Sequence, residues 1–431
     1  MPSTRYEHVS TLVLGAGVTG LAAGVASSGI VLERKRVAGG ICSSYYMAPK
    51  GEGHGAYRFE YGGGHWIFGG RPDILEWIER RSPTRTYERL SAVYFPDRDL
   101  YVPYPLQNHL SFLGRSNAQR VLNELASNDR SAFPVTMSEW LMSTFGPTLC
   151  ELFFFPFHEA YTAGLYTRIA PQDPGKSPVD LARVREGARQ TNPPAAGYNV
   201  HFRYPLHGLD RLVGTMVRDC DVRLGNAVTA ISPESRKVTV SDGGIFGYRR
   251  LVATLPLHQI LALAGIDAGC PPDPYTSVLV LNIGGIAGPR CPDHHWLYVP
   301  ESQSGFHRVG FYSNVDASFL PPTADAGSRV SIYVEKAFLA ENRPEGEELE
   351  KYQRAVVQEL QDWGYLLEPE VMDPTWVDVA YTWSWPGSDW RAKAVAQLEA
   401  SGIEPVGRYA RWHFQGIADS IRDGLAITQG A

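Results

Sequence analysis

Residues 9–33 read VSTLVLGAGVTGLAAGVASSGIVLE, which is the pattern of a strand, a glycine turn, a helix of small residues and a second strand. Residues 9–14 are apolar and partly β-branched, as a buried parallel strand requires. The glycine turn at residues 15–20 has the spacing GxGxxG, and the second strand, residues 30–32, is followed by the acidic Glu33. The glycines alone are a weak signal, but in this context they predict a dinucleotide-binding βαβ unit.

Each glycine of this turn, and the acidic residue after the second strand, has a physical role. Gly15 and Gly17 permit a tight turn and the close approach of a pyrophosphate, and Gly20 lets the helix pack on the strand. The N-terminus of the helix presents free N–H groups to the phosphates, and Glu33 accepts hydrogen bonds from the ribose hydroxyls. Only twelve residues separate Gly20 from Glu33, so we expect a short crossover helix.

The length, net charge and cysteine content of the chain limit the classes of protein to which it can belong. Its 431 residues are too many for one hydrophobic core, so we expect two or three domains. The formal net charge of −6 argues against a nucleic-acid or membrane partner. Five scattered cysteines without a CxxC pair indicate reduced thiols and no metal site. Without a signal peptide or an apolar stretch of about 18 residues, the chain is expected to be cytoplasmic.

Two further glycine motifs distinguish FAD from NAD. Gly39 and Gly40 follow Glu33 closely, and residues 62–65, GGGH, come some twenty residues later. They resemble the second and third FAD fingerprints of the flavoprotein group that contains amine oxidases, protoporphyrinogen oxidase and UDP-galactopyranose mutase. Paired glycines let the backbone lie flat against an isoalloxazine ring, where a Cβ would collide. Three such motifs in this order predict FAD as the cofactor.

Several longer blocks narrow the resemblance within that group. The blocks are GGHWIF at 63–68, VPYPLQN at 102–108, LYTRIA at 165–170, WLYVPE at 296–301 with FHR at 306–308 and SN at 313–314, and GRYARW at 407–412. They resemble motifs of the UDP-galactopyranose mutases, especially the eukaryotic type, and they are scattered over nearly the whole chain. The block at 102–108 and the segment at 296–314 are the most specific, because general flavin oxidases lack them.

The resemblance implies an α/β fold in three parts. The first is a Rossmann-like FAD-binding domain of the GR2 type of flavoprotein, which is discontinuous and formed by residues 1–70, 204–268 and 403–431. The second is an inserted, mainly helical domain at 71–203. The third is an antiparallel β-sheet domain at 269–402, which is expected to take the substrate.

The resemblance also implies an activity. The family consists of isomerases that interconvert pyranose and furanose forms of a nucleotide-diphosphate sugar without net redox change, with N5 of reduced FAD as the nucleophile. Such an enzyme needs an external flavin reductant and a cationic clamp for the diphosphate, a role that suits arginine. Arg168 and Arg308 match the two diphosphate arginines of the family, and His65 matches its histidine beside the flavin. The oligomeric state stays open.

The remaining site candidates come from the same motifs. The substrate candidates are Tyr104, Gln107, Asn314, Tyr381 and Phe414, the last of which stands where the family has a tyrosine on the diphosphate. The cofactor candidates are Gly15, Gly17, Thr19, Gly20, Glu33, Arg34, Gly39, Gly40, Gly62, Gly63, Gly64, Val228, Arg408 and Asp419.

Two other interpretations stay open. One is a true redox enzyme, an FAD-dependent oxidase or desaturase of the amine oxidase or protoporphyrinogen oxidase type. The other is a flavoprotein with a decayed active site that is retained for binding. The arginine pair favours the mutase, because an amine oxidase has little use for two cations near the flavin. Phe414 and the divergent segment 157–167 leave the base, the sugar and the retention of mutase chemistry undetermined.

Overall fold

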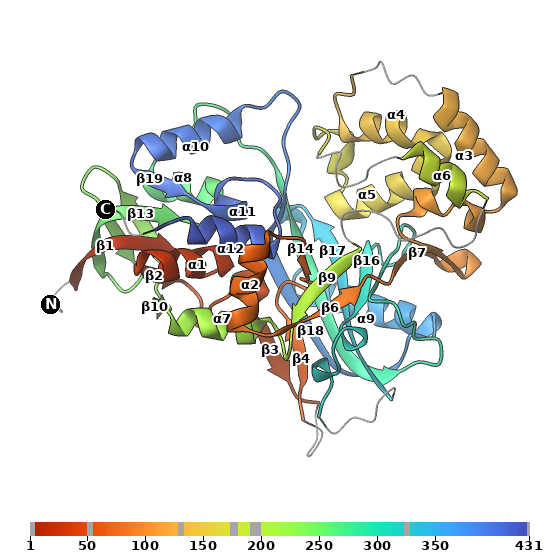
Figure 1. Cartoon of the computed structure of the whole chain (residues 1–431), viewed down its shortest axis with the longest axis horizontal. Helices are drawn as coiled ribbons and strands as arrows, with labels where there is room; N and C mark the ends of the chain where they lie inside the picture. The colour runs from red at the N-terminus through yellow and green to blue at the C-terminus, as the bar shows by residue number, and fades with distance from the viewer. Residues whose placement is uncertain are drawn as a thin grey trace.

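The fold has an α/β part, a large antiparallel sheet and a separate group of helices, which occupy different regions of Figure 1. It is a computed structural model that describes residues 5–49, 55–127, 133–172, 180–189, 200–322 and 328–428. The α/β part and the additional sheet confirm the fold class expected from the sequence.

The α/β part is built on a mixed sheet with a parallel centre. The sheet runs in the order β10 (Asp221–Leu224), β2 (Ile30–Glu33), β1 (Tyr6–Leu14), β13 (Ile245–Ala253), β12 (Lys237–Val240) and β11 (Val228–Ser232), and β19 (Ile403–Pro405) also pairs with β13. Strands β10, β2, β1, β13 and β19 are parallel. Residues Leu12, Val13 and Leu14 of β1 are fully buried, as in a strand covered on both faces.

Helices cover this sheet on both faces. Those in contact with its strands are α1 (Val18–Ser27), α7 (Leu209–Arg218), α8 (Leu257–Ala264) and α10 (Trp390–Ala400). The helices α2 (Pro72–Arg81), α11 (Gly407–Ala410) and α12 (Ile417–Leu425) pack on these helices. The crossover helix α1 has only ten residues, which confirms the expected short helix. It packs closely on α12, which is possible because Gly424 has no side chain: a Cβ there would lie 2.2 Å from the carbonyl oxygen of Thr19. The C-terminal segment thereby returns to the first βαβ unit.

The second large sheet is antiparallel except for one parallel pair. It runs in the order β18 (Leu366–Thr382), β14 (Tyr275–Ala287), β17 (Arg329–Phe338), β16 (Arg308–Phe311), β15 (Trp296–Tyr298), β7 (Ser91–Phe95) and β8 (Leu100–Pro103), and α9 (Gly346–Asp362) packs on β18. Only β15 and β7 are parallel in this sheet. Strands β7 and β8 come from the segment 71–203, so part of the segment expected to be mainly helical extends this sheet.

The separate helical group lies beside β16 and β17 (Figure 1). It contains α3 (Arg115–Ser127), α4 (Met137–Leu149), α5 (Phe155–Thr162) and α6 (Leu181–Gly187). Helix α4 begins at a capping box, in which Thr136 Oγ1 accepts from the N–H of Glu139 and the Glu139 carboxylate accepts from the N–H of Thr136. Helix α5 packs against β17, which brings the helical group next to Arg308.

Two small sheets join these parts. One pairs β3 (Ser44–Met47) with β4 (Tyr57–Glu60), and the other has the order β5 (Ile67–Phe68), β9 (His201–Pro205) and β6 (Thr84–Glu88). None of the helices described has the length and apolar character that a bilayer crossing would require.

Candidate functional site

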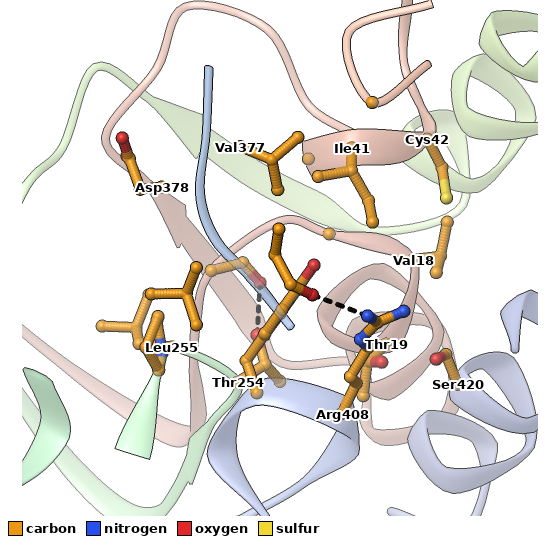
Figure 2. A pocket seen from close by; sticks show the side chains of 18 of the residues that line it. Val18, Thr19, Ile41, Cys42, Thr254, Leu255, Val377, Asp378, Arg408 and Ser420 are labelled. Atoms are coloured by element: carbon orange, nitrogen blue, oxygen red, sulfur yellow. Dashed lines mark hydrogen bonds between the residues drawn. The ribbon is translucent and has the colours of Figure 1, made fainter. Parts of the chain in front are cut away.

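A cavity of about 730 Å³ runs from the carboxyl ends of β1 and β2 to the face of the antiparallel sheet. One end is lined by Glu33, Arg34 and the segment 226–228, and the other by His65, Arg308 and Tyr381. Figure 2 shows its middle, where Leu255 and Asp378 lie on one side and Cys42, Val18 and Ser420 on the other. A cavity at the carboxyl ends of parallel strands is where a doubly wound sheet binds its ligand.

The glycine turn after β1 forms one wall of the cavity. Gly15 has φ +96° and supports a tight turn that ordinary residues rarely adopt, and a Cβ on Gly20 would lie 1.8 Å from the carbonyl oxygen of Gly15. No side chain caps the first turn of α1, whose residues Val18 and Thr19 line the cavity. Free N–H groups at a helix N-terminus favour an anion such as a pyrophosphate.

Glu33 closes this wall from the end of β2. Its Oε2 accepts a hydrogen bond of 2.9 Å from the backbone N–H of Ala16, and its Oε1 accepts one of 2.9 Å from the N–H of Lys35. The carboxylate therefore fixes the glycine turn while it faces the cavity. Next to it Arg34 lines the cavity and pairs with Asp378 of β18 at 2.9 Å.

The second and third glycine motifs line the middle of the cavity. The N–H of Gly39 donates to the carbonyl of Ala16 at 2.7 Å, so the second motif is fixed to the first. A Cβ on Gly64 would lie 2.1 Å from Tyr333 Oη. The loop can therefore reach the antiparallel sheet only because no side chain is present there.

His65 follows these glycines as a half-buried residue of the cavity lining. Burial, together with the charges of Arg408 and Arg308, lowers the pKa of His65 to about 3. The imidazole is consequently neutral at physiological pH, and its Nδ1 makes no hydrogen bond to the described residues.

Arg308 is paired with a carboxylate that the sequence motifs do not include. Its Nε donates to Glu335 Oε2 at 3.0 Å, and its Nη2 also contacts this oxygen. Burial disfavours both charges, but the pKa of Arg308 is raised because Glu335 stabilises the guanidinium. The pKa of the Glu335 carboxyl is raised by burial, and Arg308 opposes this shift. Both side chains line the cavity.

Arg408 provides a second cation near this end. Its Nη2 donates to the carbonyl oxygen of Ala380 at 2.6 Å (Figure 2). Its guanidinium carbon lies 4.7 Å from the ring centre of Phe414 and 5.9 Å from that of Tyr381. Phe414 is 45% exposed and lies at the rim of the cavity. Arg308, Arg408 and neutral His65 therefore share one region with several aromatic rings.

Most of the cofactor candidates from the sequence lie on the cavity. They are Gly15, Gly17, Thr19, Glu33, Arg34, Gly39, Gly40, Gly62, Gly64, Val228 and Arg408. Gly20 and Gly63 lie directly behind this lining. Asp419 lies outside it and pairs with Arg422 at 2.8 Å, while its neighbour Ser420 lines the cavity.

Four of the substrate-site candidates lie outside this cavity. Arg168 is exposed, and its guanidinium lies 5.2 Å from the ring centre of Trp385. Asn314 donates its amide hydrogens to the carbonyls of Pro292 and His294. Tyr104 packs on Tyr298 with 4.7 Å between ring centres, and Gln107 is buried in the segment that follows.

The structure adds residues that the sequence motifs did not indicate. Glu335 is the most important, and its position could be recognised only from the register in which β17 pairs Glu335 with Arg308. Gln415 and Ser420 form a hydrogen-bonded pair of 3.0 Å at the cavity wall. Among the described residues there is no cluster of three or more His, Cys, Asp or Glu side chains that could hold a metal ion.

Comparison with known proteins agrees with this geometry. The sequence profile of flavin-containing amine oxidoreductases matches residues 18–264. A solved structure of reduced UDP-galactopyranose mutase is similar with a TM-score of 0.83 at 21% identity, over 97% of this chain and 94% of that chain. A putative protoporphyrinogen oxidase from Exiguobacterium sp. 255-15 has a TM-score of 0.70 at 18% identity, over 99% and 98%. Putrescine oxidase bound to putrescine has a TM-score of 0.57 at 14% identity, over 98% of each chain.

The fold and the cavity define an FAD-binding flavoprotein. The open space beside Gly17, where a Cβ would meet nothing within 4 Å, and the uncapped N-terminus of α1 fit the pyrophosphate of that cofactor. The chain belongs to the flavin-containing amine oxidoreductase family, and its cofactor is FAD.

Proposed function

We propose that the protein is a flavin-dependent mutase that interconverts the pyranose and furanose forms of a nucleotide-diphosphate sugar. The observation that carries this proposal is the pair of arginines, Arg308 and Arg408, beside neutral His65 at one end of the FAD cavity. Guanidinium groups bind phosphate oxygens through two-point, charge-assisted hydrogen bonds. The similarity in fold to reduced UDP-galactopyranose mutase over nearly the whole chain supports the same class of substrate.

In this proposal the chain positions the sugar and holds the leaving group. The bound flavin, once reduced by an external donor, supplies the nucleophile, and no net redox change occurs. Arg308 binds the diphosphate and stabilises its charge. Arg408, which the sequence motifs assign to FAD, is here assigned to the diphosphate as well, because it lies at the same end of the cavity. Tyr381 has its pKa raised to about 12, mainly by burial. Its hydroxyl therefore stays protonated and can donate to a substrate oxygen.

The residues outside the cavity would complete the substrate site. FAD is assigned to the discontinuous domain, and the nucleotide to the helical and antiparallel-sheet segments. Tyr104 and Gln107 are assigned to the base, and Arg168, placed on the helical group, to the diphosphate. These assignments rest on the motif matches, because these side chains do not line the cavity.

An FAD-dependent oxidase of the amine oxidase or protoporphyrinogen oxidase type is the second candidate. The specific observation in its favour is Glu335, whose carboxylate cancels the charge of Arg308 and offers a partner for a substrate cation. The family to which the chain belongs contains such redox enzymes.

A panel of nucleotide-diphosphate sugars incubated with dithionite-reduced and with oxidised protein tests the two candidates. The mutase predicts isomerised sugar by chromatography with the reduced protein only, without peroxide release. Arg308→Ala should lower turnover by roughly 30- to 1,000-fold, since a desolvated charge contact contributes about 2–4 kcal/mol. Arg329→Ala is the matched control, because Arg329 pairs with Glu370 elsewhere on the same sheet.

Peroxide released in proportion to an amine substrate, with no isomerised sugar, would contradict the mutase and support the oxidase. Arg168→Ala is a second variant that tests the mutase proposal. The proposal predicts that it weakens binding of nucleoside diphosphates more than binding of monophosphates, as measured by calorimetric titration.

A further inference from the structure

The charge of Arg308 is already compensated before any substrate binds. Glu335 Oε2 accepts from both Nε and Nη2 of this arginine. The Glu335 side chain is 2% exposed, and that of Arg308 is 20% exposed. The pair therefore lies within the cavity lining with its carboxylate shielded from water and its guanidinium still accessible.

No second cation supports this carboxylate on its other side. Glu335 Oε1 accepts no hydrogen bond from any described side chain, and it faces Gly63, whose Cβ, if present, would lie 2.7 Å away. The Nε2 of His307 lies 3.8 Å from Oε2, but burial and the charge of Arg308 lower the pKa of His307 well below its usual value. Arg308 is thus the only positive charge in direct contact with Glu335 among the described residues.

Three buried tyrosines around Glu335 are neutral. Tyr333 lies on the same strand, Tyr312 follows β16, and Tyr381 is on β18, and burial raises the pKa of each of these hydroxyls. They can neither take up nor release a proton when a ligand arrives near neutral pH. Of the groups in direct contact with Arg308, Glu335 is therefore the one whose protonation can change.

We propose that Glu335 is a displaceable counter-ion, which an anionic substrate separates from Arg308 and which takes up one proton from solvent as it is displaced. The physical reason is that a buried carboxylate without its cation is costly, and it avoids this cost by becoming a neutral carboxylic acid. The balance is one phosphate-bearing ligand and one proton bound together, with no bond broken. This inference rests on the proposed function, since it takes a nucleotide-diphosphate sugar as the ligand.

Proton uptake makes binding depend on pH in a defined direction. When one proton is bound with the ligand, the Kd rises by up to about ten-fold for each unit of increasing pH. A cationic amine would behave in the opposite way, because it would bind to the ionised Glu335 carboxylate without proton uptake. The sign of the effect at Glu335 therefore separates anionic from cationic substrates.

The test is calorimetric titration of the FAD-loaded, oxidised protein with UDP-galactose at pH 7 and pH 8. UDP-galactose is suitable because neither of its phosphates titrates in this range and the oxidised protein does not turn it over in the proposed mechanism. Titrations in HEPES and in Tris, which have different ionisation enthalpies, give the number of protons taken up. We expect about one proton for the wild type.

Glu335→Gln should take up no proton and should bind UDP-galactose at least about ten-fold more tightly than the wild type at pH 8. Glu370→Gln is the matched control, because Glu370 pairs with Arg329 on the same sheet outside the cavity. It should keep the proton uptake of the wild type. In a second arm benzylamine replaces the nucleotide sugar.

The outcomes separate the two proposals. UDP-galactose binding without proton uptake by the wild type, or weaker binding by Glu335→Gln, overturns the counter-ion role and leaves the mutase in place. Failure of every nucleotide-diphosphate sugar to bind overturns both. Benzylamine binding that Glu335→Gln abolishes supports the oxidase and also overturns the counter-ion role.

Discussion

Replacement of Glu33 by alanine should weaken FAD binding for two separable reasons. The carboxylate holds the N–H groups of Ala16 and Lys35 at 2.9 Å each, and we propose that it also accepts hydrogen bonds from the ribose of FAD. The partly exposed backbone contacts contribute about 1 kcal/mol together, and a charge-assisted contact to ribose about 1.5–3 kcal/mol. The sum of about 2.5–4 kcal/mol predicts roughly 70- to 900-fold weaker binding.

The assay is reconstitution of flavin-free protein with FAD, followed by flavin fluorescence, together with the melting temperature with and without FAD. Glu33→Gln keeps the shape and loses the charge, so its effect should be intermediate. Glu7→Ala is the control, because Glu7 lies on β1 of the same sheet and its ion pairs with described residues, Arg5 and Arg223, lie at the surface. If Glu33→Ala binds FAD within three-fold of the wild type, the assignment of Glu33 to the cofactor is wrong.

Three further predictions concern other parts of the molecule. Burial raises the pKa of Glu60 to about 7, so its contribution to stability is complete below the unfolded pKa and is lost as the pH rises through 7. Between pH 6 and pH 8 the wild type should lose about 1 kcal/mol that Glu60→Gln does not lose, measured by urea unfolding, and equal losses would contradict the shift. Gly64→Ala should destabilise the protein by about 1–3 kcal/mol, because its Cβ would lie 2.1 Å from Tyr333 Oη. The helical Gly214→Ala, whose Cβ would make only an ordinary contact of 3.9 Å with the Arg218 side chain, should be neutral or stabilising in the same melts, and equal effects would refute the steric argument. Phe414→Tyr adds a hydroxyl at the cavity rim and should tighten nucleotide-diphosphate sugars by about 0.5–1.5 kcal/mol; weaker binding in calorimetry would contradict the motif match.

The cofactor part of the cavity was accessible from sequence because its signals are local. The turn at Gly15, the short helix after it and the acidic Glu33 depend on the chemistry of consecutive residues, and the structure places them on one cavity. In the last helix, α12, the sequence motif does not tell which of two adjacent residues faces the cavity. Successive residues of an α-helix differ by about 100° in direction, so Ser420 lines the cavity while the adjacent Asp419 points to Arg422.

The substrate end of the cavity could not be derived in this way. A motif gives the position of Arg168 in the chain but not the direction in which its side chain points from the helical group. In the structure the Arg168 guanidinium lies over the ring of Trp385. Asn314 belongs to a motif block, yet its amide holds a neighbouring loop. Glu335 has no motif of its own. The antiparallel register between β16 and β17 places Glu335 against Arg308. A strand register that pairs residues 27 positions apart cannot be predicted from a single sequence.

The position of Glu335 also bears on how one fold can accommodate different substrates. With Glu335 ionised, the substrate end carries two arginines and one carboxylate, and therefore a net charge of about +1 with neutral His65. With Glu335 protonated, the same residues carry about +2, which matches the two negative charges of a nucleotide-diphosphate sugar. In the proposal an amine requires the first state and a diphosphate the second. One buried carboxylate next to Arg308 is therefore sufficient to select between the two classes of substrate, and measurement of its protonation on ligand binding addresses that choice more directly than comparison of folds.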